Sequence, residues 1–162
     1  MSEALTDQLI KSEYSALKAE MLLRIAIQNL VILVAIVLFV PSALLIVTAP
    51  QYASVLALIY VAANLALALQ WCHQGVRQCA LKQAILACDQ AAGRDSSWET
   101  WLPTQRPASM LGSRWFISTK LVFIGLSAAA IVLAIKCFDV VLLCSAIVFF
   151  ITVAVLLTNP KE

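Results

Sequence analysis

The sequence is poor in charged residues. Asp, Glu, Lys and Arg make up 12% of its 162 residues, whereas about a quarter is usual in soluble domains. So few charges exclude an ordinary water-soluble surface, and the 62% of hydrophobic residues indicates that lipid surrounds most of the fold. The net charge of +2 is too close to balance to suggest a nucleic-acid partner.

Recognisable catalytic and cofactor motifs are also missing. The sequence contains no Walker loop, no GxGxxG and no HExxH. Its single histidine, His73, lies near Cys72 and Cys79 but has no acid nearby in the sequence to orient it as a base. Two or three such groups make an incomplete metal site. We therefore expect no enzymatic activity, no cofactor and no metal.

Cysteine usage gives no sign of a disulfide framework. The five cysteines are an odd number and contain no CxxC pair. We expect reduced thiols that act as small apolar side chains. They are Cys72, Cys79, Cys88, Cys137 and Cys144.

Four apolar stretches are each long enough to cross a membrane. They cover residues 25–48, 52–72, 115–136 and 140–158, and about 20 helical residues span the roughly 30 Å of hydrocarbon. Each must be helical, because backbone groups in lipid need partners within their own segment. The sequence thus predicts an all-α integral membrane protein, a single four-helix membrane domain over residues 1–162. Acidic residues before the first stretch argue against a cleaved signal.

The connections predict two hairpins and an orientation. Residues 49–51 join the first pair of spans and residues 137–139 the second pair, where we expect Lys136 and Asp139 to form an exposed ion pair. Most basic residues flank the opposite ends of the spans. The positive-inside rule therefore places both termini and residues 73–114 in the cytoplasm, most simply at a bacterial inner (plasma) membrane.

Two cytoplasmic segments are predicted to form a helical stalk. Residues 1–24 lack glycine and proline and read as an amphipathic helix, with Glu20 and Arg24 at the i,i+4 spacing of a helical ion pair. An extension of the second span, residues 76–92, has an apolar stripe of its own, interrupted before it only by Gly75. We expect the two helices to pair antiparallel. The stripe residues are Ile10, Tyr14, Leu17, Met21, Leu81, Ile85, Cys88 and Ala92.

A short helix over 96–102 is predicted from the capping-box spacing of Ser96 and Glu99, and a loop over 104–113 follows it. The tryptophans of this helix suggest a position at the lipid headgroups or against the stalk. Cytoplasmic contacts with a protein partner are expected from six residues: Tyr14, Leu17, Leu81, Ile85, Trp98 and Trp101.

Polar residues inside the spans are the strongest functional candidates, because each needs a partner in lipid. Asn64 lies near the middle of the second span and serves either as adhesive between helices or as pore lining. Gln28 and Asn29 are expected to be satisfied at the interface. Lys120 either extends its side chain back to the cytoplasmic interface or binds an anion. Pro41 predicts a kink, which is a structural feature here or part of a transporter's broken helix.

Small residues four apart allow helices to approach closely. Gly125 with Ala129, and Ala62 with Ala66, have this spacing. We expect tight packing, and a homo-oligomer in the lipid bilayer.

Three functions remain open. The first is an oligomeric membrane anchor or scaffold, or a signal-receiving subunit, with a cytoplasmic protein partner. The second is a pore-forming or membrane-perturbing effector, because the architecture resembles that of small bacterial membrane effectors of anti-phage defence. The third is a small-solute transporter, suggested by Pro41, Asn64 and Lys120.

Overall fold

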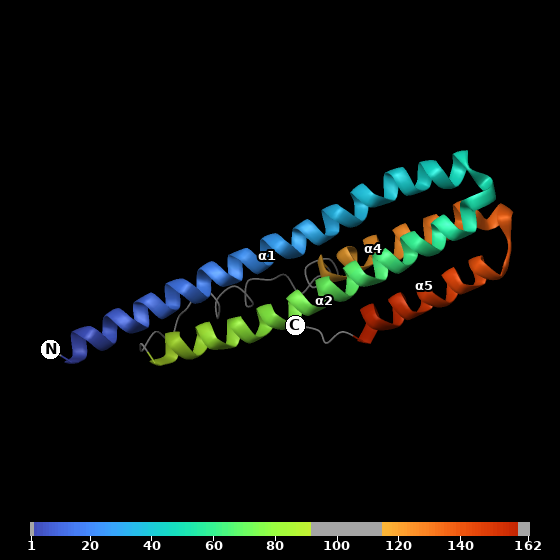
Figure 1. Ribbon diagram of the computed structural model, residues 1–162. Coiled ribbons are helices and arrows are strands. Elements are labelled where there is room, and N and C mark those ends of the chain that lie inside the picture. Colours follow the sequence, from blue (N-terminus) through green and yellow to red (C-terminus); the bar gives the residue numbers. More distant parts are fainter. Residues whose placement is uncertain (1, 92–114, 159–162) are drawn as a thin grey trace. The chain divides into compact units, whose positions relative to one another are not determined.

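A computed structural model describes residues 2–91 and 115–158 of the chain, and the side chains of residues 11–90 and 119–158. Nearly all of these residues are helical, which confirms the predicted all-α class. The elements in chain order are α1 (Ser2–Thr48), η1 (Pro50–Tyr52), α2 (Ala53–Ala91), α4 (Trp115–Ala134), η2 (Ile135–Cys137) and α5 (Val140–Thr158), coloured along the sequence in Figure 1.

Four of these helices contain stretches that are long and apolar enough to cross a membrane. In the described part of the chain these stretches are Lys11–Thr48, Pro50–Gln90, Thr119–Cys137 and Val140–Thr158. The predicted short helix over 96–102 and the loop over 104–113 lie outside the described residues.

Helix α1 continues through its only proline. Pro41 has no N–H to donate to the carbonyl of Val37, four residues earlier. Next to it, the hydroxyl of Ser42 donates to the Leu38 carbonyl across 2.7 Å. The helix ends at Thr48, and Pro50 then starts η1, consistent with the preference of proline for the first position of a helix.

Asp139 begins helix α5 as its N-cap. Its carboxylate accepts hydrogen bonds from the backbone N–H of Leu142 across 2.9 Å and from the hydroxyl of Ser54 across 2.8 Å. The predicted ion pair between Lys136 and Asp139 is wrong, since the two side chains do not form one. The physical reason is that the first turn of a helix presents unpaired N–H groups that an aspartate satisfies locally.

The described residues fall into two compact units. Of the described residues, unit 1 contains 2–28 and 74–91, and unit 2 contains 29–73 and 115–158. Both α1 and α2 carry residues of each unit.

The interior of unit 2 contains two apolar clusters, and α4 packs against α5 there. Cluster 1 consists of Ile46, Ala53, Ala57, Tyr60, Val61, Ala130, Ala134 and Leu142. Cluster 2 consists of Val31, Ala35, Ala68, Trp71, Cys72, Phe123 and Leu156. Alanines are frequent in both clusters, and such small side chains let helices pack closely.

Candidate functional sites

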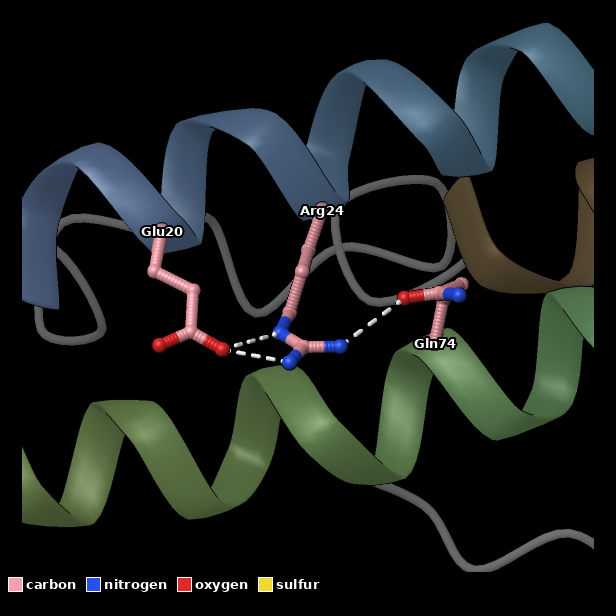
Figure 2. A network of polar contacts seen from close by, with 3 residues as sticks. All are labelled: Glu20, Arg24 and Gln74. Carbon is pink, nitrogen blue, oxygen red and sulfur yellow. Dashed lines mark hydrogen bonds and ion pairs between the residues drawn. The ribbon is translucent and has the colours of Figure 1, made fainter.

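Arg24 connects α1 to α2 within unit 1. Its Nε donates to Glu20 Oε1 across 3.0 Å, its Nη2 donates to the same oxygen, and its Nη1 donates to Gln74 Oε1 across 3.3 Å. Figure 2 shows the guanidinium of Arg24 between the two partners. The i,i+4 pair of Glu20 and Arg24 is the one expected from the sequence, whereas the bond to Gln74 required the fold to bring residues 50 apart together. We call these three residues the polar clasp.

A second polar contact joins the same two helices in unit 1. Gln78 Nε2 donates to Gln28 Oε1 across 3.0 Å. Gly75 lies beside it, and a Cβ added at that glycine would sit 3.8 Å from Gln28 Nε2, an ordinary van der Waals distance. Gln28 therefore bonds to a side chain of the other helix. Asn29, its neighbour in the sequence, is exposed.

The predicted partner contacts in unit 1 differ in exposure. Tyr14, Leu17 and Leu81 are partly exposed, and the Nζ of Lys18 lies 5.5 Å from the centroid of the Tyr14 ring. Ile85 is fully buried, so in this arrangement it packs inside unit 1 and presents no surface to a partner. The physical reason is that Ile85 lies on the apolar stripe that the helix turns inward. Trp98 and Trp101 lie outside the described residues.

Asp89 is a buried carboxylate that the sequence analysis overlooked. Its side chain is 3% exposed, and Oδ2 has no hydrogen-bond partner among the described residues. Acidic residues are almost never fully buried unless they are paired, so the residue type alone did not predict this burial. The available signal was spacing, because Asp89 follows Ile85 by four residues and so lies on the same helix face.

Asn64 lies in the interior of unit 2 and joins α2 to α4. Its Nδ2 donates to the Phe123 carbonyl across 2.8 Å and to Ser127 Oγ across 2.6 Å. The residue is fully buried, and its Oδ1 has no hydrogen-bond partner in the described part of the chain. The amide thus bonds to a neighbouring helix, one of the arrangements considered from the sequence, and one acceptor is left over.

Tyr60 makes a similar link from α2 to α1. Its hydroxyl donates to the Ala35 carbonyl across 3.1 Å, and its ring meets that of Phe39 edge to face with centroids 5.4 Å apart. A second aromatic contact joins α2 to α4, where the ring centroids of Trp71 and Phe123 lie 6.2 Å apart. Unit 2 is therefore held by specific polar and aromatic contacts as well as by apolar packing.

The remaining predicted site residue is Lys120 of α4, which is partly exposed and has an interaction partner. Gly125, one of the small residues of that helix, is exposed, and a Cβ added there would meet nothing within 4 Å. Gly125 is therefore not a point of close helix packing within unit 2.

Asp139, which lies between η2 and α5, has a carboxyl group with a lowered pKa. The hydrogen bond from the Leu142 backbone, followed by the one from the Ser54 hydroxyl, holds the pKa of Asp139 below its usual value. Nearby, the Sγ of Cys137 donates to the Pro50 carbonyl across 3.1 Å. These contacts join Pro50 of η1 to Cys137 of η2, and Ser54 of α2 to Asp139.

Metal-ligating side chains do not gather in groups of three or more anywhere in residues 11–90 or 119–158. Cys72 is buried and its neighbour His73 is exposed. Comparison with known protein families, with characterised proteins and with solved structures finds no match to this chain.

Proposed function

We propose that the protein is a small oligomeric membrane anchor whose cytoplasmic helices receive a protein partner or signal. The observation that carries this proposal is the length of α1 and α2. They contain 47 and 39 residues, whereas about 20 suffice to cross a bilayer. Each helix thus has roughly a second span's length available outside the lipid, and this surplus supplies residues to unit 1.

The contacts of unit 1 support a receiving role. The polar clasp and the bond between Gln28 and Gln78 join α1 to α2. The two helices therefore present a single surface to which both contribute residues. Tyr14, Leu17 and Leu81 are the partly exposed residues on which we place the partner contact. A cytoplasmic protein is the fitting occupant, because the basic residues that flank the spans favour the cytoplasmic side for unit 1.

The interior of unit 2 favours anchoring over conduction by a single copy. Its buried polar side chains mostly bond to one another or to backbone carbonyls, as with Asn64, Tyr60 and Ser145. A water-filled path needs a continuous polar lining. Large apolar side chains instead cover the outside of the unit, among them Leu33, Val40, Ile59, Val132 and Phe150, which suits contact with lipid and with further copies.

The mass of the intact complex, extracted with its native lipids, tests oligomerisation. We expect a complex of at least two copies, and a single copy would overturn the oligomeric anchor. Two variants test whether the exposed face of α4 at Gly125 contacts another copy. Gly125→Leu places a large side chain on this face, and Gly75→Ala, at a buried position of unit 1, is the control because it changes no exposed surface. We expect Gly125→Leu to lower the copy number and Gly75→Ala to leave it unchanged.

Orientation is tested separately with reporters. A fusion at Glu162 that is active only in the cytoplasm is expected, and an active periplasmic reporter at that position would contradict the topology. Release of the protein from membranes by carbonate would contradict insertion altogether.

Membrane potential distinguishes the anchor from a pore-forming effector. Under the anchor proposal, a potential-sensitive dye reports no depolarisation when the protein is expressed. Depolarisation that is lost with Asn64→Leu, while the folded protein still accumulates, would favour the effector instead. Uptake of a solute that depends on Asn64 would in the same way favour a transporter.

A further inference from the structure

The two ends of unit 1 differ in how α1 meets α2. One end carries the polar clasp and the bond between Gln28 and Gln78, and there both helices continue into unit 2. The helices run in opposite directions (Figure 2), so residues of α1 before the clasp lie across from residues of α2 after it. We call residues 11–18 of α1 and 81–90 of α2 the outer end of unit 1.

Asp89 lies at the outer end, on the face of α2 that meets α1. Gln78, Ile85 and Asp89 recur at spacings of seven and four residues, which places them on one side of the helix. Gln78 of this face bonds to α1. Ile85 is fully buried, Asp89 is 3% exposed, and Asp89 Oδ2 has no hydrogen-bond partner among the described residues. The closed arrangement of the two helices therefore buries a carboxyl group without satisfying it.

The burial of Asp89 disfavours the closed arrangement. Whether charged or neutral, a carboxyl group loses hydrogen bonds to water when it is buried, and Oδ2 gains none from the described residues in exchange. This cost applies only while the helices are closed, because their separation at the outer end returns the group to water. An unsatisfied buried group of this kind changes such an equilibrium by about 5- to 150-fold.

We propose that the outer end of unit 1 opens and closes while the polar clasp stays formed, and that Asp89 keeps the open form populated. Local opening of one part of a fold, with the rest intact, is a general property of proteins. The hydrogen bonds at the clasp end hold the helices together there. Opening exposes Ile85 and Asp89 together. The proposal rests on contacts inside unit 1 and does not depend on the proposed function.

Distances between spin labels test the opening in the full-length protein in lipid nanodiscs. One pair of labels is placed at Ala16 and Gln90 of the outer end, and a control pair at Leu23 and Val76 beside the clasp. All four side chains are exposed, and labels carried on noncanonical amino acids leave the cysteines in place. We expect a short and a long distance population for the outer pair and one population for the control pair. A single population for the outer pair, or two populations for both pairs, would overturn the proposal.

Substitutions test the role of Asp89 with the outer pair of labels. Asp89→Leu replaces the carboxyl group by an apolar side chain of the same branched shape, and we expect the ratio of open to closed molecules to fall at least about fivefold. Asp89→Ala, which adds no bulk, should lower the ratio as well. Gln83→Leu is the matched control, because Gln83 is an exposed residue of the same helix, and it should leave the ratio unchanged. An unchanged ratio in both Asp89 variants, or an equal fall in the control, would overturn the role of Asp89.

Discussion

The hydroxyl of Ser54 donates a hydrogen bond to the carboxylate of Asp139 across 2.8 Å, although the two residues are 85 positions apart in the sequence. Ser54 lies in the first turn of α2, and Asp139 is the N-cap of α5. One carboxylate therefore both starts a helix and ties that helix to another.

Replacing Asp139 by Ala should destabilise unit 2. The substitution removes the acceptor for the Leu142 N–H and for the Ser54 hydroxyl, and loss of an N-cap weakens a helix start. Thermal unfolding in detergent should show a lower midpoint for Asp139→Ala, and a smaller decrease for Ser54→Ala, which loses one of the two bonds. Lys136→Ala serves as the control, because Lys136 is exposed and forms no ion pair with Asp139. An equal decrease in that control would contradict the assigned role of Asp139.

Low pH should remove the stability that the charged carboxylate of Asp139 gives to the folded protein. The folded-state pKa of Asp139 is lowered, so the folded protein favours the charged form more than the unfolded chain does. The resulting stability is complete above the unfolded pKa of about 3.9 and is lost as pH falls through the lower folded value. Unfolding midpoints of the native protein and of Asp139→Asn, measured from pH 6 down to pH 3, should therefore converge toward the acid end. A constant difference over this range would exclude the charged carboxylate as the cause.

Asn64 should be required for the stability of unit 2. Asn64→Leu removes both hydrogen bonds to α4, and each interhelical bond of this kind contributes about 0.6–2 kcal/mol, so we expect a free energy of unfolding lower by about 1–3 kcal/mol. Ser127→Ala should cost less, because the bond to the Phe123 carbonyl remains. The measurement is reversible unfolding in mixed micelles.

Asn29→Leu is the control for this substitution, because Asn29 is exposed. Its free energy of unfolding should change by less than about 0.5 kcal/mol. If Asn64→Leu were as stable as this control, the contacts of Asn64 with α4 would have no energetic importance.

Gly75→Ala should stabilise the protein. Glycine in a helix interior is less favourable than alanine by about 0.5–1 kcal/mol, and the added Cβ would meet Gln28 Nε2 at an ordinary 3.8 Å. Gly125→Ala should give a similar gain, since nothing lies within 4 Å of its added Cβ. Both gains should appear as higher unfolding midpoints in detergent. A loss at Gly75 alone would show that the contact between Gly75 and Gln28 is tighter than the structure indicates.

Composition and hydrophobic runs by themselves determined the helical class and the places where helices begin and end. The predicted stretch 140–158 coincides with α5, and the break predicted at 49–51 falls where α1 gives way to η1. Local rules suffice for such features, because proline and long apolar runs act on the residues beside them. The same rules predicted the bond between Glu20 and Arg24, which depends on spacing within one helix.

Tertiary structure decided which polar groups on different helices meet. The sequence suggested that Asn64 needs a partner, but only the packing of α2 against α4 selected Phe123 and Ser127. It likewise brought Ser54 to Asp139, 85 residues further along the chain. The bond from the Leu142 N–H to Asp139 is a local helix cap, which the predicted pairing of Asp139 with Lys136 missed. The physical reason is that partners on different helices depend on how each helix is rotated about its own axis. That rotation is set by the fit of many side chains at once, which no short stretch of sequence encodes.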